Sequence, residues 1–237
     1  MSSKSFKFKQ FEVQHDKCAM KVGTDGVLLG AWVAAQLSNT QPKMILDIGT
    51  GSGLIALMLA QAFKKSNIIG IEIDQQAAQQ AADNFEKSPW NDRLKCIHAD
   101  INTHNQAQYD LIVSNPPYFQ NSLKNPQQEK ATARHTGNLS YQQLTSIAAD
   151  MLEDDGRLAI IIPFDSEKQF VDIAERNLLF LNKAMRVRGN ENKDFKRSLM
   201  IFSRHKTDNI SFDEITLETT DHQRTEKYQI LTQDYYL

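Results

Sequence analysis

The chain has 237 residues, of which 41% are hydrophobic and 24% charged, and its formal net charge is −2. This composition is ordinary for a large globular domain that buries its own core. No apolar run approaches the roughly 20 residues that a membrane-spanning helix needs, and the N-terminus lacks the apolar stretch of a signal peptide. The two cysteines, Cys18 and Cys96, form neither a CxxC pair nor a Cys/His metal pattern. We therefore expect a cytoplasmic protein with reduced thiols, no bound metal and no membrane association.

Strands and helices are predicted to alternate through most of the chain. This alternation is typical of an α/β fold with a mostly parallel sheet and helices on both faces. Two further strands, 184–189 and 198–205, predict an antiparallel hairpin at the sheet edge, which makes seven strands in all. Short apolar runs predict the other strands at 43–48, 67–73, 93–98, 109–113 and 156–163, and helical periodicity predicts helices at 53–65, 75–87, 140–152 and 166–179, with Ser140 as an N-cap.

The first 40 residues are predicted to pack on this core as an N-terminal addition. Residues 6–22 alternate like a strand pair, and Thr24 or Asp25 can cap a helix that runs through Leu37. We expect a strand pair and helix over residues 1–40 and the main domain over residues 41–237, which together form a single domain. The long polar loop 114–139 has the length of a functional lid or binding loop.

A glycine-rich loop follows the first predicted strand of the main domain, with the sequence Asp47-Ile48-Gly49-Thr50-Gly51-Ser52-Gly53. Glycines at a strand-to-helix turn let backbone N–H groups approach a ligand closely. The dinucleotide fingerprint G-x-G-x-x-G would place its third glycine at Leu54, so the loop departs from the pattern of NAD-binding proteins. Its candidate ligand-binding residues are Asp47, Gly49, Thr50, Gly51 and Gly53.

Acidic residues end the next two predicted strands. Glu72, with Ile73 beside it, lies about 20 residues beyond the glycine loop, where a carboxylate can bind a ribose diol. Asp74 is better placed to cap the following helix. Asp100, followed by Ile101, offers an acceptor for an adenine amino group. Each acid alone is equally well explained as a strand-end charge or a cap, but together they meet at the sheet edge where such folds bind ligands.

The tetrapeptide Asn115-Pro116-Pro117-Tyr118 follows the fourth strand. Its two prolines fix φ and remove two N–H donors, and Pro116 keeps Asn115 out of the helical region. The segment therefore presents an amide side chain, bare carbonyl groups and an aromatic ring, which suit a planar amino group. An ordinary turn explains the tetrapeptide equally well when it is taken alone. The glycine loop and the strand-end acids favour a binding site.

Together these motifs resemble those of class I S-adenosylmethionine-dependent methyltransferases. Asp47–Gly53 looks like their cofactor loop, Glu72 their ribose acid and Asp100 their adenine-side acid, and Asn115–Tyr118 looks like the motif of their amino-methylating members. Over nearly its whole length the chain resembles one bacterial family more closely, the tRNA1(Val) (adenine(37)-N6)-methyltransferases. The closer resemblance is carried by Phe11-x-Val13, the segment Met20–Trp32, Arg134-His135 ahead of Leu139-Ser140, Lys196-Arg197 and the terminal segment Tyr228–Leu237.

The resemblance implies a Rossmann-like class I fold, S-adenosylmethionine as cofactor and a valine tRNA as partner. The Asn115 side chain and the Pro116 carbonyl would hold the adenine amine beside the cofactor, and Tyr118 would stack on the base. Thr24 and Asp25 would line the cofactor pocket, although a helix-cap role explains them equally well.

A basic segment between Lys183 and Lys206 contains eight lysines and arginines against Glu191 and Asp194. Because phosphate contacts dominate nucleic-acid affinity, this segment is expected to bind tRNA while the target base swings out of its loop. Solvated strand or loop positions explain the N-terminal lysines and the Arg134-His135 pair equally well. The candidate tRNA-binding residues are Lys7, Lys9, Arg134, His135, Arg186, Arg188, Lys193, Lys196 and Arg197.

Other functions fit part of this pattern. A protein glutamine N5-methyltransferase would use the same tetrapeptide, but its relatives carry a helical domain ahead of the cofactor loop, and only 46 residues precede Asp47. In ribosomal RNA guanine-N2 methyltransferases the motif usually ends in Phe rather than Tyr118, and a DNA adenine methyltransferase needs a separate target-reading domain. A non-catalytic RNA-binding module is the alternative outside enzymes, which the intact motifs disfavour.

Overall fold

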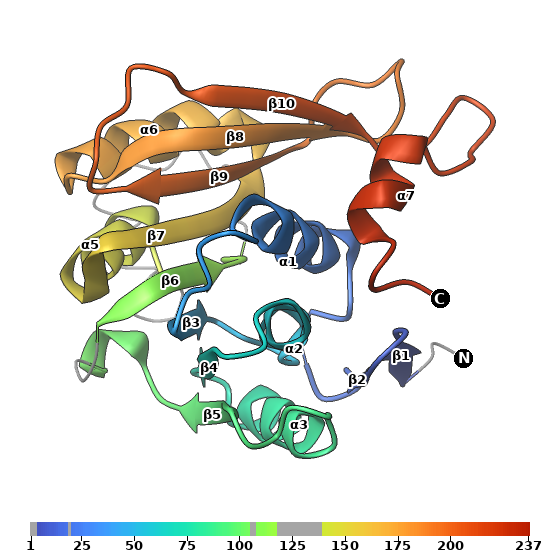
Figure 1. The fold of residues 1–237 in the computed structure, drawn as a ribbon, viewed down its shortest axis with the longest axis vertical. Coiled ribbons are helices and arrows are strands. Elements are labelled where there is room, and N and C mark those ends of the chain that lie inside the picture. Colours follow the sequence, from blue (N-terminus) through green and yellow to red (C-terminus); the bar gives the residue numbers. More distant parts are fainter. Residues whose placement is uncertain (1–3, 19, 105–107, 118–138) are drawn as a thin grey trace.

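One mixed sheet of eight strands organises the computed structural model, which describes residues 4–18, 20–104, 108–117 and 139–237 (Figure 1). The strand order is β10-β8-β9-β7-β6-β3-β4-β5. Within the described residues β9 alone runs antiparallel to its neighbours β7 and β8. The strands are β3 (Met44–Ile48), β4 (Asn67–Glu72), β5 (Leu94–His98), β6 (Tyr109–Ser114), β7 (Leu152–Pro163), β8 (Phe180–Arg188), β9 (Arg197–Ser203) and β10 (Ser211–Thr216).

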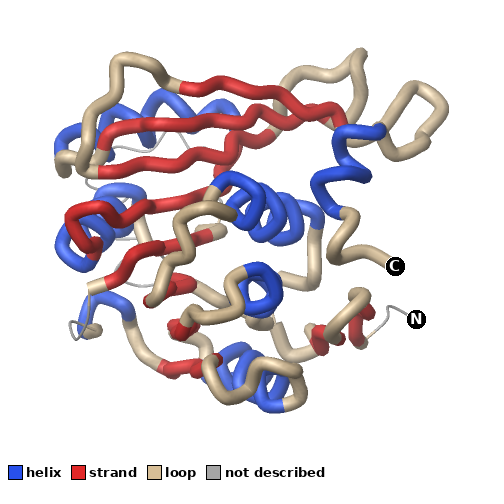
Figure 2. Tube along the Cα trace, viewed as in Figure 1, coloured by secondary structure: helices blue, strands red, loops and turns tan. Residues whose placement is uncertain are grey.

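Helices cover both faces of the sheet (Figures 1 and 2). Successive residues of the central strands therefore enter two separate apolar cores, because side chains alternate across a strand. Ile45 and Leu111 pack in the core under α1, α2 and α3, whereas Leu46 and Ile112 pack in the core under α5 and α6. No helix in the described part of the chain has the length and apolar character that crossing a membrane requires. The helices are α1 (Thr24–Gln36), α2 (Leu54–Ala62), α3 (Gln75–Glu86), α5 (Tyr141–Met151), α6 (Glu167–Arg176) and α7 (Glu226–Thr232), with short 3₁₀ turns η1 (Ile101–Thr103) and η2 (Phe164–Ser166).

The predicted fold class is confirmed, with one strand more than the seven expected. The eighth, β10, pairs in parallel with β8, so the predicted hairpin β8–β9 lies one position inside the edge. In β10 the first four residues are exposed and only Ile215 is buried. This segment has neither an apolar run nor clear alternation, which is why the sequence pattern gave no strand there.

The N-terminal strand pair is also confirmed, as β1 (Ser5–Lys7) and β2 (Glu12–Gln14) in antiparallel register. The expected cap of the following helix is wrong, since α1 is capped by Gly23 without a side-chain hydrogen bond. Ser140 does cap α5, in a reciprocal arrangement with the side chain of Gln143. The division of the chain at residue 40 stays a prediction.

The two ends of the described chain meet on one side of the sheet (Figure 1). The backbone N–H of Lys9 donates to the carbonyl of Tyr235 at 2.9 Å, and the rings of Phe8 and Tyr236 stack with centroids 6.0 Å apart. The Tyr235 ring is only 4% exposed, and its hydroxyl donates to the carbonyl of Met58 in α2 at 3.4 Å. The C-terminal segment is therefore part of the same core as α1 and α2.

Replacing the buried ring of this segment tests that packing. Tyr235→Ala should lower the free energy of unfolding by about 3–5 kcal/mol, because it leaves a cavity against α2. Tyr235→Phe removes only the hydroxyl and should cost about 1 kcal/mol. Urea denaturation measures both, with Ile230→Ala as the control, since Ile230 is 57% exposed on α7. Equal losses for the alanine and phenylalanine variants would contradict the packing role of the ring.

Candidate active site

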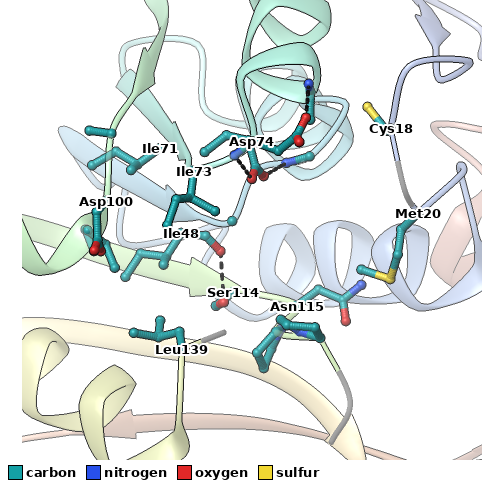
Figure 3. Close-up of a pocket in the computed structure, with 18 of the residues that line it drawn as sticks. Cys18, Met20, Ile48, Ile71, Ile73, Asp74, Asp100, Ser114, Asn115 and Leu139 are labelled. Carbon is teal, nitrogen blue, oxygen red and sulfur yellow. Dashed lines mark hydrogen bonds between the residues drawn. The ribbon is translucent and has the colours of Figure 1, made fainter. Parts of the chain in front are cut away.

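A cavity of about 470 Å³ opens at the carboxyl edge of the sheet (Figure 3). We call it the edge cavity. Its walls come from the ends of β3, β4, β5 and β6, the first turn of α3, Leu139, and the segment before α1. Of the residues that the sequence predicted for the site, it is lined by Gly49, Gly51, Glu72, Ile73, Asp100, Ile101, Asn115, Pro116 and Pro117.

Sequence reasoning missed several residues of the wall. Lys17, Cys18 and Met20 belong to the N-terminal segment, more than 25 residues before the glycine loop. The only sequence feature that pointed to this segment was the family-like motif, which begins at Met20. Ser114 and Leu139, which flank the long polar loop, complete the opposite side of the cavity.

Two glycines of the loop form an open cradle at the cavity floor. Gly49 and Gly51 have φ values of 70° and 56°, and a Cβ on either would meet no other atom within 4 Å. That space lets a ligand approach the backbone directly. Gly53 differs, since a Cβ there would lie 2.4 Å from Cε1 of Phe85. Gly53 is therefore required by the packing of α2 against α3, and it is not part of the cavity lining.

Asp47 lies buried beneath the loop and does not line the cavity. One carboxylate oxygen accepts from the Thr50 hydroxyl at 2.7 Å and from the Ala56 N–H at 3.3 Å. The other oxygen has no partner among the described residues. Burial raises the pKa of Asp47 to about 7, since desolvation disfavours the charged form. Asp47 and Thr50 thus brace the loop from below.

The two strand-end acids that line the cavity also hold backbone in place. The Glu72 carboxylate accepts from the N–H groups of Gly51 at 2.9 Å and Asp74 at 3.0 Å, so it ties β4 to the glycine loop. Asp100 caps η1 by accepting from the Asn102 N–H at 2.9 Å. Asp74 caps α3 as expected, through the Ala77 N–H at 2.8 Å. Asp100 therefore both caps η1 and lines the cavity, and its predicted contact with adenine stays a prediction.

The end of β6 brings the Asn-Pro-Pro segment to the glycine loop. The hydroxyl of Ser114 donates to the carbonyl of Ile48 at 2.9 Å, which joins the last residues of β6 and β3 (Figure 3). Asn115 and both prolines then face the same cavity as Gly49. The remaining members predicted for this side, Tyr118, Arg134 and His135, lie outside the described residues.

Thr24 and Asp25 are not among the residues of the cavity wall. They form the first turn of α1, where the Asp25 carboxylate accepts from Nε of Arg197 at 2.9 Å. The structure therefore places this pair beside the start of β9. Their predicted contact with a cofactor stays a prediction.

Several predicted tRNA-binding cations have partners within the fold, and the partners of the arginines are acidic. Arg186 pairs with Glu167 at 2.7 Å, and Arg188 lies 3.4 Å from Glu214. Arg197 pairs with Asp25 as described, and Lys9 donates to the carbonyl of Gln233. The acids lie outside the basic segment of the sequence, so the charge excess counted along the chain is partly compensated in space.

Two cations of that segment are exposed in the loop between β8 and β9. β8 runs parallel to β7, and the loop that follows it lies at the same sheet edge as Asn115. This loop carries Lys193 and Lys196, both with exposed side chains. Lys7 is exposed on the separate N-terminal strand pair.

The family model described as methyltransferase small domain matches residues 29–175, more than half of the chain. The structure is similar to that of a predicted O-methyltransferase from Agrobacterium tumefaciens, with a TM-score of 0.68 at 16% identity, covering 89% of this chain and 96% of the other. It is also similar to the 16S rRNA N2 G1207 methyltransferase of T. thermophilus, with a TM-score of 0.60 at 17% identity over 85% of this chain and 50% of the other. At these identities the solved structures establish the fold, and the family match makes the protein a methyltransferase.

Curated relatives give the particular family. The chain is 45% identical to a tRNA1(Val) (adenine(37)-N6)-methyltransferase of Christiangramia forsetii, over 100% of this chain and 99% of the relative. It is 41% identical to the protein of the same name from Proteus mirabilis, over 98% and 93% of the two chains. The chain belongs to the tRNA1(Val) (adenine(37)-N6)-methyltransferase family, which confirms the resemblance seen in its motifs.

The buried Asp47 predicts a pH-dependent stability difference. Between about pH 4 and pH 7 the folded state keeps a proton that the unfolded chain has released, so a rise in pH destabilises the native protein. Asp47→Asn removes this linkage. The stability of the variant relative to the native protein should therefore rise across this window, by on the order of 1 kcal/mol per pH unit. Urea denaturation at several pH values measures the difference, and parallel curves for the two proteins would contradict it.

Proposed function

We propose that this protein transfers the methyl group of S-adenosylmethionine to N6 of adenine 37 in the anticodon loop of a valine tRNA. The observation that carries the proposal is the meeting of Asn115-Pro116-Pro117 with the Gly49–Gly51 cradle in one cavity. A site for an amine acceptor thereby lies next to a site for a nucleoside cofactor. Relatives at 41–46% identity that are named tRNA1(Val) (adenine(37)-N6)-methyltransferase support a valine tRNA as the substrate.

The residues of the edge cavity fit S-adenosylmethionine. Its volume lies within the range of about 300–1,000 Å³ that is usual for small-molecule sites. The open faces of Gly49 and Gly51 would accommodate the amino-acid end, and Glu72 and Asp100 offer acceptors for the ribose and the adenine. When bound, S-adenosylmethionine supplies a methyl group made electrophilic by its sulfonium.

Asn115 and Pro116 would prepare the acceptor amine. The adenine amino group is a poor nucleophile because its lone pair is delocalised into the ring. If the Asn115 amide oxygen and the Pro116 carbonyl each accept one N–H, the lone pair can turn out of the ring plane. The same oxygens stabilise the positive charge that develops on the nitrogen, so they act more strongly in the transition state than in the ground state.

The rigidity of the segment contributes to this role. The two prolines restrict the backbone, and the Ser114–Ile48 hydrogen bond fixes the start of the segment against β3. Acceptors that are already in place cost little reorganisation during the reaction. Orientation of the amine would provide much of the rate acceleration.

The tRNA would approach the open side of the sheet edge. A base in an anticodon loop is accessible to protein because the loop is single-stranded and the base can be swung out. Lys193 and Lys196 are the better-placed cations for its phosphates, since they are exposed at the edge that carries Asn115. A tRNA substrate also accounts for the expected cytoplasmic location.

Identification of the methylated nucleoside tests the proposal directly. The protein is incubated with radiolabelled S-adenosylmethionine and unmodified total tRNA, and the RNA is digested to nucleosides. Label in N6-methyladenosine from a valine tRNA supports the proposal. Label only in a guanosine, or in protein glutamine rather than RNA, would replace it with one of the rival activities.

Asn115→Ala should separate chemistry from cofactor binding. Loss of one preorganised acceptor should lower kcat by about 10²–10³-fold. The Kd for S-adenosylmethionine, measured by calorimetry, should change much less. Asn91→Ala, at an exposed asparagine after α3, is the control and should keep full activity. Unchanged kcat in Asn115→Ala would remove Asn115 from the mechanism.

The exposed lysines predict a change in salt dependence. Lys193→Ala and Lys196→Ala should each reduce the slope of log K for tRNA binding against log salt concentration by about 1, because each removes one phosphate contact. The matched control is Lys95→Ala, an exposed lysine on β5 at the opposite end of the sheet. Filter binding over a range of salt concentrations measures the slopes. Equal slopes for all variants would place the tRNA elsewhere.

A further inference from the structure

We propose that Gln80 and Asn84 are positioning residues that hold the N-terminal segment Gln14–Cys18 as a wall of the cofactor site. The inference rests on the cofactor part of the proposed function and is independent of the RNA substrate. Both side chains belong to α3 and are only 2% exposed. They are four residues apart, so they lie on the same face of the helix. We call the pair the amide clamp.

Gln80 binds the part of the segment that reaches the cavity. Its Oε1 accepts from the backbone N–H of Lys17 and from the thiol of Cys18, each at 3.0 Å. Its Nε2 donates to the Asp16 carboxylate at 2.7 Å, and this hydrogen bond lowers the pKa of Asp16. Lys17 and Cys18 themselves line the edge cavity. One buried amide thus fixes three consecutive residues at the cavity wall.

Asn84 connects this wall to the glycine loop. Its Oδ1 accepts from the N–H of Gln14 at 3.0 Å, and its Nδ2 donates to the carbonyl of Gln14 at 2.9 Å. The same Nδ2 also donates to the carbonyl of Ser52 at 2.8 Å. Ser52 lies between Gly51, which lines the cavity, and Gly53. The Asn84 side chain therefore spans the distance between two walls that are far apart in the sequence.

The polarity of the clamp argues that it serves the site as well as the fold. An apolar residue at either position would bury the same helix face, whereas a buried amide is costly unless its hydrogen bonds are satisfied. Here six protein groups outside α3 occupy the two amides, and all belong to the N-terminal segment or to the glycine loop. Met20, just beyond the clamped residues, lines the cavity with half of its side chain exposed. The clamp thereby sets the position of the cavity wall that also contacts solvent. A ligand would enter and leave the cavity beside this wall.

Loss of the clamp should let this wall move and speed the release of cofactor. Gln80→Ala and Asn84→Ala should each raise the Kd for S-adenosylhomocysteine about tenfold, mainly through a faster dissociation rate. Calorimetry gives the Kd and stopped-flow fluorescence the rates. Hydrogen exchange at the Lys17 amide should accelerate in Gln80→Ala. Gln79→Ala is the matched control, because Gln79 is exposed on the same helix and bonds only Asp83 among the partners seen.

The kinetics of the loaded enzyme distinguish positioning from general loss of structure. The KM for S-adenosylmethionine should rise about tenfold while the KM for tRNA stays within about twofold. Should the clamp variants fail to fold, Asp16 provides the test at an exposed position. Asp16→Ala removes the acceptor of Gln80 and should weaken cofactor binding, whereas Asp16→Asn keeps an acceptor oxygen and should restore it.

Two outcomes separate the proposals. A native protein that binds no S-adenosylhomocysteine would overturn the cofactor assignment itself. A native protein that binds it, together with clamp and Asp16 variants whose Kd lies within twofold of the native value, would overturn the positioning role alone.

Discussion

The parallel pairing of β3 with β4 on one side and with β6 on the other is the constraint on which the site depends. In this register Ile48 lies opposite both Ile71 and Ser114, so β3 and β6 end level with one another and β4 extends one residue further, to Glu72. The glycine loop leaves β3 at that level, between the acid of β4 and the amide that follows β6. Gly70 in β4 makes room for the loop, since a Cβ there would lie 2.8 Å from Thr50. A shift of one residue in either pairing would turn the strand-end side chains to the other face.

Hydrogen bonds between neighbouring strand ends then make the edge rigid. Glu72 at the end of β4 accepts from the glycine loop, and Ser114 at the end of β6 donates to the last residue of β3. Asp47 accepts from Thr50 beneath the loop. None of these bonds needs a ligand. The groups that we assign to the reaction therefore rest on a frame that is complete before substrate arrives, as preorganised catalysis requires.

The charge excess counted along the sequence differs from the charge that the fold leaves unpaired. The count over residues 183–206 indicated a strongly basic surface, yet three of its four arginines pair with Glu167, Glu214 and Asp25. The Arg186 guanidinium also lies over the rings of Phe164 and Phe212, so it contributes to the packing around β8 and β10. A sequence count includes only neighbours along the chain, and the compensating acids came from three other elements.

Local patterns predicted the parts of the fold and site that depend on local chemistry. The glycine loop and the strand ends were predicted from short sequence motifs. The Asp74 and Ser140 caps were predicted in the same way, and their hydrogen bonds close within three residues. The sequence could not predict which glycine of the loop faces the cavity and which is required for packing. Gly49 and Gly53 differ only in the atoms that surround them in the fold. The N-terminal wall was missed for the same reason, since Lys17 and Cys18 reach the cavity only through α3.

The C-terminal segment was recognised by resemblance, and the structure gives its physical role as a partner of the first strands. That contact affects the order in which parts of the fold can form during synthesis. The bond between Lys9 and Tyr235 joins residues at nearly opposite ends of the chain. During synthesis the central sheet can assemble as its strands emerge, but the N-terminal hairpin lacks its aromatic partner until Tyr235 and Tyr236 leave the ribosome. The hairpin directly precedes the clamped wall, so in a nascent chain the strand ends of the edge cavity can form before its N-terminal wall is secured.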